Sequence, residues 1–195
     1  MLELVFFSNN KNKIKEVSNY FVNTGIEILS LNDLKKIESP QETGVTFEEN
    51  AQIKSSYCYN IFKKKCFSDD SGLCIEAMNG EPGIYSKNFI QKHKNIKLAF
   101  EKIFLEVKKK NNFNAFFQTS ICLKTSKEES VFFKGIIRGT ISKTTRGLDG
   151  FGYDPIFIPN GYKKTFGEMS IAEKNLISHR SMAIKKLKNF LTKSI

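Results

Sequence analysis

The first part of the chain alternates short apolar runs with longer stretches in which apolar side chains recur at helical spacing. Residues 2–7 and 26–31 are predicted strands, and residues 11–22 between them are a predicted helix. A second helix is expected after Thr46, because Thr46 and Glu49 match the pattern of a capping box. Strands that alternate with helices in this way are typical of a sheet with parallel strands.

The later part of the chain has a different pattern. Residues 115–125 and 130–142 are long β-rich runs on either side of a charged turn, which predicts an antiparallel hairpin. One helix is predicted over residues 94–109, and a helical region is predicted to begin at the capping-box pair Ser170 and Glu173. Together these patterns predict an α/β fold with a central mixed, twisted sheet flanked by helices.

Two adjacent acidic residues interrupt an apolar run in the middle of the chain. A strand is predicted to end at Asp69 and Asp70, with Ser71 and Gly72 forming a turn before a second strand over residues 73–78. Mg²⁺ binds through one or two carboxylates together with substrate phosphates, so this pair is a candidate metal site. Neighbouring strand residues face opposite ways, so one aspartate can reach a metal or a water while the other faces a basic group. The alternative is a turn in which both carboxylates are solvated.

Length and charge place limits on the kind of protein. The 195 residues suit a single domain over residues 1–195. The net charge of +11 suits a polyanionic partner such as nucleic acid, but it is equally typical of a lysine-rich composition. We favour the second interpretation, because many lysines stand in short runs such as residues 63–65 and 108–110.

Cysteine and histidine usage indicates the compartment. The four cysteines are not spaced as metal ligands, and His93 and His179 form no ligand pattern with them. Buried free thiols in a reducing compartment are expected. The start of the chain has no basic segment or cleavage site of a signal peptide, and no apolar run is long enough to span a membrane. A cytoplasmic location is therefore predicted, without a membrane partner.

The junction between the first strand and the first helix is a candidate phosphate site. Ser8, Asn9 and Asn10 follow the strand, and Lys11 and Lys13 lie in the first turn of the helix. Free N–H groups at a helix start attract an anion, so lysines at that end are consistent with a phosphate chain beside them. The alternative is an asparagine-capped helix with solvated lysines.

Two later stretches could bind a nucleotide base. Glycines flank Phe151, and either Phe151 or Tyr153 could stack on a base, although core packing is the commoner fate of such rings. His179 and Arg180 are adjacent donors close to Lys174 in sequence, and could donate to the O6 of a purine. The alternative for these three residues is surface charge beside a helix start.

Read in order, these stretches closely resemble the inosine triphosphate pyrophosphatase family, also called Ham1-like. The motifs are "SNNKNK", "ETGVTFEENAQIKS", "DDSGL", "NGEPGIYS", "GFGYDPIF", "KTFGEM" and "EKNLISHR", and they cover nearly the whole chain. The resemblance implies two lobes around a long central cleft and a homodimer. It also implies Mg²⁺-dependent hydrolysis of the noncanonical purine nucleotides ITP, dITP and XTP to the monophosphate and pyrophosphate, which cleanses the nucleotide pool.

The resemblance also implies roles for individual residues. Asp70 and Lys13 are the implied catalytic residues, and the implied metal ligands are Asp70, Asp69 and Glu38. The implied contacts to the substrate are Ser8, Asn9, Asn10, Lys11, Asn12, Lys13, Lys54, Ser71, Phe151, Gly152, Tyr153, Asp154, Lys174, His179 and Arg180.

Two other functions remain open from the residues alone. The first is a basic protein that binds nucleic acid, with its aromatic residues as stacking platforms. The second is a related hydrolase that acts on standard nucleotides or on modified pyrimidine nucleotides. No specific nucleic-acid partner is expected in the favoured interpretation.

Overall fold

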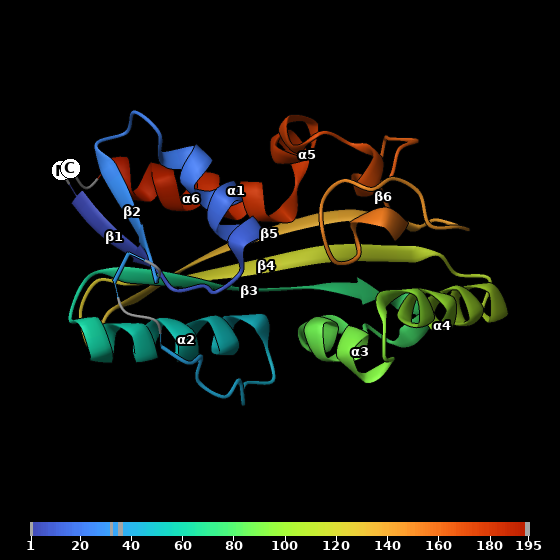
Figure 1. Ribbon diagram of the computed structural model, residues 1–195, viewed down its shortest axis with the longest axis horizontal. Coiled ribbons are helices and arrows are strands. Elements are labelled where there is room, and N and C mark those ends of the chain that lie inside the picture. The colour runs from blue at the N-terminus through green and yellow to red at the C-terminus, as the bar shows by residue number, and fades with distance from the viewer. Residues whose placement is uncertain (1, 32, 35–36, 194–195) are drawn as a thin grey trace. The chain divides into compact units, whose positions relative to one another are not determined.

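The computed structural model of the protein describes residues 2–31, 33–34 and 37–193 (Figure 1). The strands are β1 (Leu2–Phe6), β2 (Ile26–Ser30), β3 (Cys66–Ile75), β4 (Asn114–Lys124), β5 (Ser130–Ile141) and β6 (Phe157–Pro159). The α-helices are α1 (Lys11–Phe21), α2 (Phe47–Phe62), α3 (Ser86–Lys92), α4 (Ile96–Lys109), α5 (Ile171–Ile177) and α6 (His179–Lys193). Short 3₁₀ helices are η1 (Glu76–Met78), η2 (Gly83–Tyr85), η3 (Asp154–Ile156) and η4 (Phe166–Glu168).

The strands form one mixed sheet, in the order β2-β1-β3-β4-β5-β6. β1 pairs in parallel with both β2 and β3, whereas β5 and β6 are antiparallel. A mixed sheet flanked by helices was predicted and is confirmed. The long cleft between lobes, which the resemblance implies, stays a prediction.

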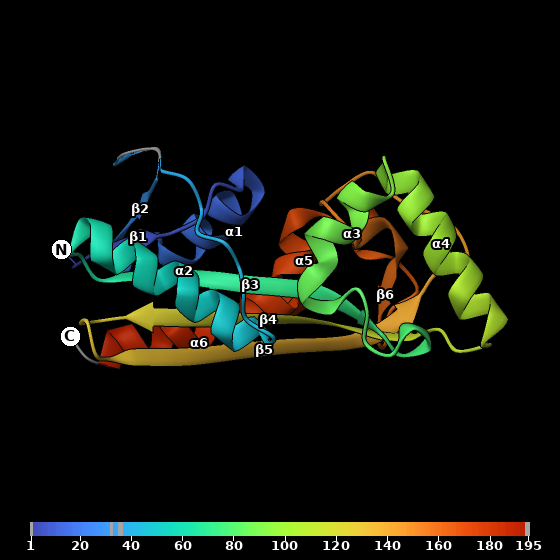
Figure 2. The same cartoon turned by 90° about the horizontal axis from the view of Figure 1, so that it is seen from below.

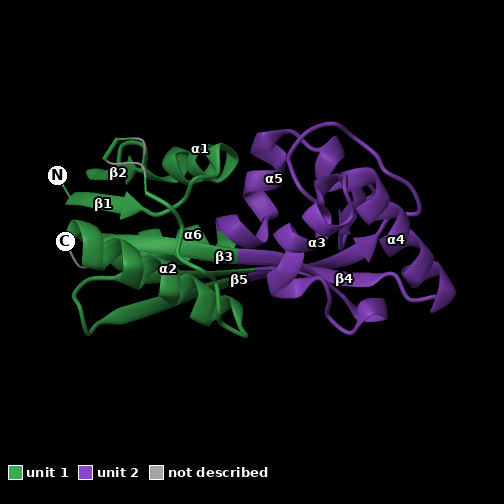
Figure 3. Ribbon diagram, turned by 60° about the horizontal axis from the view of Figure 1, so that its bottom comes forward, with its two compact units in different colours: residues 1–70, 119–134, 182–195 green, residues 71–118, 135–181 purple. Residues whose placement is uncertain are grey.

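The chain divides into two compact units (Figure 3). Unit 1 comprises Met1–Asp70, Thr119–Lys134 and Met182–Ile195, and unit 2 comprises Ser71–Gln118 and Gly135–Ser181. The backbone passes from unit 1 to unit 2 within β3, between Asp70 and Ser71. The single domain expected over the whole chain stays a prediction.

Helices cover both faces of the unit 1 strands. Figures 1 and 2 show α1 and α6 on one side of these strands and α2 on the other. On the first side Val17 of α1 and Leu187 of α6 pack with Phe6 and Phe67, whose rings are stacked 4.7 Å apart. On the other side Cys58 of α2 packs with strand residues. These two layers of apolar contact hold β3 between helices, and β3 carries the two aspartates.

The predicted end of the strand at Asp69 and Asp70 is wrong, because β3 continues without a break to Ile75. The expected turn at Ser71 and Gly72 is therefore also wrong. A carboxylate, a hydroxyl and a glycine in sequence are typical of a turn, but here both carboxylates are paired with lysines, as described below. Charge neutralised in this way does not force a strand to end.

Gly72 brings β3 close to a neighbouring segment of unit 2. A Cβ atom at Gly72 would lie 2.1 Å from the carbonyl oxygen of Gly83 and 2.5 Å from Oγ of Ser86. Oγ of Ser86 also accepts a hydrogen bond of 3.0 Å from the backbone N of Leu73. The absent side chain at Gly72 is what allows this approach.

The remaining sequence predictions are mostly confirmed. Ser170 and Glu173 form a complete capping box at α5, and Thr46 caps α2 by accepting from the N of Glu49. Among the α-helices and strands, α3 and β6 were not predicted, and they are only 7 and 3 residues long. The strand predicted over residues 73–78 is wrong after Ile75, because Glu76–Met78 form the 3₁₀ helix η1. Part of the loop predicted over residues 32–45 lies outside the described residues. Among the described helices, none is long and apolar enough to cross a membrane.

Candidate active site

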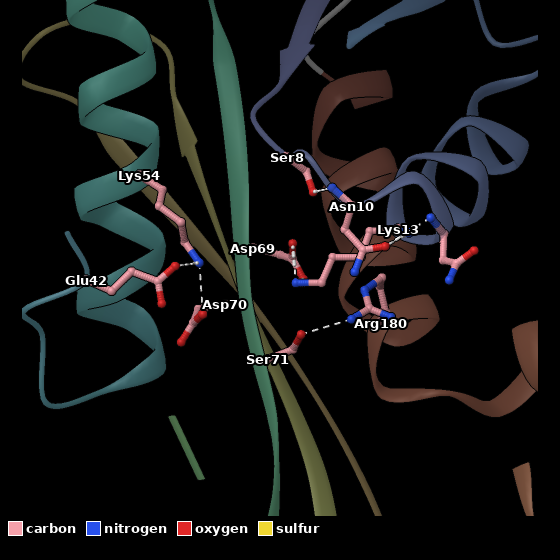
Figure 4. A network of polar contacts seen from close by, with 10 residues as sticks. Ser8, Asn10, Lys13, Glu42, Lys54, Asp69, Asp70, Ser71 and Arg180 are labelled. Carbon is pink, nitrogen blue, oxygen red and sulfur yellow. Dashed lines mark hydrogen bonds and ion pairs between the residues drawn. The ribbon is translucent and has the colours of Figure 1, made fainter. Parts of the chain in front are cut away.

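Asp69 and Asp70 point to opposite faces of β3 (Figure 4). The carboxylate of Asp69 lies 2.9 Å from Nζ of Lys13 on α1, and that of Asp70 lies 2.8 Å from Nζ of Lys54 on α2. Both aspartates are buried, with exposed fractions of 4% and 6%. The opposite facing of the two side chains was predicted, and the structure confirms it. Lysines from two helices therefore offset the two charges.

The start of α1 is capped by asparagine. Oδ1 of Asn10 accepts hydrogen bonds of 3.0 Å and 3.2 Å from the N of Asn12 and of Lys13, and Oγ of Ser8 accepts from the N of Asn10. The asparagine-capped helix, which was the alternative to a phosphate site, is therefore present. Lys13 is not simply solvated, because its ammonium group binds Asp69, whereas Asn9, Asn10, Lys11 and Asn12 are exposed.

A third acidic residue lies beside Lys54 on the α2 side. Oε1 of Glu42 lies 3.0 Å from Nζ of Lys54, so this ammonium group is shared by Glu42 and Asp70. The resemblance implied Glu38 instead, and both Glu38 and Glu42 are exposed. The loop that carries Glu42 is tied to the start of α2, where the N of Val45 donates to Oε2 of Glu49 at 2.7 Å. We call Lys13, Glu42, Lys54, Asp69 and Asp70 the Asp70 cluster.

Burial and charge act against each other on the pKa values of this cluster. Burial raises the pKa of Asp70 above its ordinary value, and the nearby charge of Lys54 offsets this only in part. Burial lowers the pKa of Lys54, but the charges of Asp70, Asp69 and Glu42 outweigh it, so the pKa is raised. Lys54 is therefore firmly cationic, and Asp70 accepts a proton more readily than an exposed aspartate.

The Asp70 cluster suits a divalent cation shared with a substrate. Oδ2 of Asp70 is buried and accepts no hydrogen bond from the described residues. A buried carboxylate oxygen without a donor is costly, and a cation or an ordered water removes that cost. Nowhere in the described part of the chain do three histidine, cysteine or acidic side chains gather as a metal cluster. Mg²⁺ does not need such a cage, because it completes its shell with waters and substrate phosphates.

Unit 2 contains a second cluster of polar side chains, built around the ring of Phe151. Oδ2 of Asp154 accepts hydrogen bonds of 2.7 Å from Nζ of Lys174 and of 2.7 Å from the N of Phe151. Arg180 donates to Oγ of Ser71 at 2.9 Å. The ammonium of Lys174 and the guanidinium of Arg180 both lie over the ring of Phe151. We call Phe151, Asp154, Lys174 and Arg180 the Phe151 cluster.

Tyr153, the other stacking candidate, and His179, a candidate donor, both lie inside the protein. The hydroxyl of Tyr153 donates to the carbonyl oxygen of Ser86 at 2.7 Å, and its ring is 4% exposed. The ring of His179 is stacked on Phe117, with 4.6 Å between the centroids. Phe151 is half-buried and so is the more accessible ring, while Gly152 beside it has a positive φ of 61°. The stacking role predicted for Phe151 or Tyr153 stays a prediction.

A buried carboxylate with an oxygen lacking a donor, lysines beside a helix start, and an aromatic ring among cations are together typical of a nucleotide-processing enzyme. The comparisons define the family. The model of the Ham1 family matches residues 4–190, and the chain belongs to this family. The predicted resemblance is confirmed.

The similar proteins cover the whole chain. A dITP/XTP pyrophosphatase of Christiangramia forsetii is 41% identical over 192 residues, which are 98% of this chain and 100% of that protein. One of Flavobacterium psychrophilum is 42% identical over 97% of this chain and 98% of its own length. The structure of a HAM1 protein from Coxiella burnetii is 31% identical and covers 99% of this chain and 100% of its own, with a TM-score of 0.91.

Proposed function

We propose that the protein is a Mg²⁺-dependent nucleoside triphosphate pyrophosphohydrolase that cleanses the nucleotide pool of dITP, ITP and XTP. The observation that supports this most directly is the buried Oδ2 of Asp70, which accepts no hydrogen bond from the described residues. The names of the similar proteins support the choice of substrates. We expect a cytoplasmic homodimer, which stays a prediction.

Asp70 is proposed to hold the metal together with an acidic side chain from the loop before α2. The ligand role implied for Asp69 is a weaker proposal, because Asp69 points to the opposite face of β3 and pairs with Lys13. Glu42 fits the position in the loop better than Glu38, because Glu42 shares the ammonium group of Lys54 with Asp70. When bound, Mg²⁺ would neutralise phosphate charge and make the α-phosphorus easier to attack. The role first assigned to Glu38 is a weaker proposal, because the ion pair between this loop and Lys54 is made by Glu42.

The proposed reaction is attack of water on the α-phosphorus. The bond between that phosphorus and the oxygen bridging to the β-phosphate breaks, and pyrophosphate leaves with the electron pair. Asp70 takes the proton of the attacking water, and burial favours this because it raises the pKa of Asp70. Lys54 holds the carboxylate of Asp70 in place.

Phosphate binding is proposed for the start of α1. Ser8 and Asn10 order this turn, and Lys13 supplies charge while it is anchored to Asp69. Exposed side-chain groups of Asn9, Lys11 and Asn12 are available to the β- and γ-phosphates in this proposal.

The base is proposed to stack on Phe151 and to accept hydrogen bonds from His179 and Arg180. Hypoxanthine and xanthine carry an oxygen at position 6, whereas adenine carries an amino group there, so donors favour the first two. GTP shares this oxygen, and its 2-amino group must therefore meet an unfavourable contact. Gly152, Tyr153, Asp154 and Lys174 are proposed to shape this pocket.

A substrate panel tests this function. Release of pyrophosphate is measured from ITP, dITP, XTP, GTP, ATP and dUTP, with Mg²⁺ and with a chelator. We expect rapid hydrolysis of the first three nucleotides, and only with the metal. Equal rates for all purines, a preference for dUTP, or full activity in the chelator would each contradict the proposal. Salt-sensitive binding of single-stranded nucleic acid without any hydrolysis would favour a binding protein instead.

A further inference from the structure

A buried asparagine near the start of α2 binds the loop that carries Glu42. Oδ1 of Asn50 accepts a hydrogen bond of 2.9 Å from the backbone N of Gly44, which follows Glu42 closely in the loop. Asn50 is 3% exposed, and it shares one face of α2 with Lys54, one helical turn further on. Figure 4 shows Glu42 beside Lys54. Asn50 therefore ties the loop to the same face of α2 that Glu42 contacts.

This hydrogen bond is better protected from water than two other contacts of the same loop with α2. The side chain of Glu42 is 40% exposed, and ion pairs open to water contribute little because solvent and salt screen them. The hydrogen bond between Val45 and Glu49 is also exposed. Release of Gly44 would instead leave the buried oxygen of Asn50 without this donor, which is costly. Asn50 therefore contributes most among these three contacts to keeping the loop on α2.

The residue types at the two ends of this hydrogen bond suit the contact. Asparagine disfavours the inside of a helix, because its side chain competes for backbone groups, yet Asn50 lies in the first turn of α2. There its amide oxygen is used by the loop. On the other side, a Cβ atom at Gly44 would lie 2.7 Å from Oδ1 of Asn50 and 2.6 Å from Cβ of Glu49. Any side chain at Gly44 would therefore push the loop away from α2.

We infer that Asn50 is a positioning residue, which holds the loop so that the carboxylate of Glu42 stays in the Asp70 cluster. This inference rests on the function proposed above, in which Glu42 is the acidic ligand that the loop supplies to Mg²⁺. Without the hydrogen bond to Asn50, the loop would spend less time with Glu42 beside Asp70. The apparent affinity for the metal would fall in proportion to that fraction of time.

Hydrogen exchange of the metal-free protein, followed by NMR, tests the contact itself. Asn50→Ala should speed exchange of the Gly44 amide by about tenfold, because this N–H loses its buried acceptor. Asn60→Ala is the matched control, since Asn60 is an exposed asparagine on the same helix, and it should change this rate by less than about twofold. Unchanged exchange at Gly44 in folded Asn50→Ala would overturn the inference.

The Mg²⁺ requirement tests whether the contact acts through Glu42. Asn50→Ala should raise the Mg²⁺ concentration for half-maximal pyrophosphate release from dITP by about fivefold, and saturating Mg²⁺ should restore most of the turnover. In a Glu42→Gln background the same change should have less than about a twofold effect, because the carboxylate to be positioned is gone. A fivefold effect in both backgrounds would overturn the inference and leave the proposed function intact.

A second variant acts from the loop instead of the helix. Gly44→Ala should reproduce the fivefold effect, because its methyl group displaces the loop from Asn50, and it keeps the test decisive if Asn50→Ala does not fold. A normal Mg²⁺ requirement in Gly44→Ala would count against the inference. If the unmodified protein hydrolyses none of the nucleotides, the proposed function fails, whereas the exchange rate at Gly44 still decides whether Asn50 holds the loop.

Discussion

Each unit contains a buried aspartate–lysine pair, and the pairs Asp70–Lys54 and Asp154–Lys174 have nearly the same length. Nζ of Lys54 lies 2.8 Å from Asp70 in unit 1, and Nζ of Lys174 lies 2.7 Å from Asp154 in unit 2. They differ in what else the carboxylate binds. Oδ2 of Asp154 also accepts from the N of Phe151, whereas Oδ2 of Asp70 is buried and accepts nothing from the described residues.

This difference indicates two different roles for one kind of contact. Asp154 holds a turn and the ammonium group of Lys174 in place, so loss of Asp154 should mainly reduce the stability of unit 2. Oδ2 of Asp70 is available to a ligand, so loss of Asp70 should mainly reduce catalysis. The length of an ion pair does not distinguish these roles. The number of donors around each carboxylate oxygen does.

The largest expected effect is on turnover. Asp70→Asn should reduce pyrophosphate release by about 10²- to 10⁴-fold, because an amide cannot take the proton of water. The folded structure should persist, since Glu42 still pairs with Lys54. Turnover is measured with dITP under saturating Mg²⁺, and circular dichroism checks the fold. Near-normal turnover of the folded variant would show that Asp70 has no catalytic role.

The second effect is on stability, and here the change at Asp154 should matter more than the change at Asp70. Asp154→Ala should lower the free energy of unfolding by about 3 kcal/mol, because it leaves the ammonium group of Lys174 buried without this carboxylate. Denaturant unfolding of this variant is compared with that of Asp70→Asn. If Asp70→Asn proved the less stable of the two, the contrast between the pairs would be wrong.

The third effect separates the two acidic residues of the loop before α2. Glu42→Gln should raise the Mg²⁺ concentration needed for half-maximal activity by about tenfold, because Glu42 lies in the Asp70 cluster. Glu38→Gln is the matched control and should change this concentration by less than about twofold, since the ion pair between this loop and Lys54 is made by Glu42. The opposite order would restore Glu38 as the metal ligand.

The smallest effect is a pH dependence of stability in metal-free buffer. Burial raises the pKa of Asp70 in the folded state, so protonation of this carboxyl favours folding. That contribution is fully present below the unfolded-state pKa of about 3.9 and is lost as the pH rises through the folded-state pKa. Asp70→Asn carries no such charge, so its melting temperature should rise relative to the unmodified protein as the pH increases. A difference that does not change with pH would refute this assignment.

Most of the fold could be predicted from the sequence because apolar spacing and capping residues are local signals. The capping box at Ser170 and the hairpin after residue 114 are examples, and both are present. The continuation of β3 through Asp69 and Asp70 could not be predicted, because it depends on lysines from two distant helices. The short elements α3 and β6 have too few residues for periodicity to distinguish them from loops.

The site could be predicted only in part. The resemblance implied Asp70, Lys13 and Lys54, and the structure pairs Lys54 with Asp70 and Lys13 with the neighbouring Asp69. It did not name Glu42, since the choice between Glu42 and Glu38 depends on how the preceding loop is tied to α2. Distances between side chains in a loop arise from tertiary contacts that residue type alone does not encode.

The contact at Gly72 has a consequence for how this gene can change. Any side chain at this position would meet the backbone oxygen of Gly83, so the hindrance does not depend on polarity or size. In a library of single-codon replacements grown under selection for activity, this codon should retain only synonymous changes. A lack of surviving substitutions at position 72 would show where two segments of backbone touch, independently of the chemistry of the enzyme.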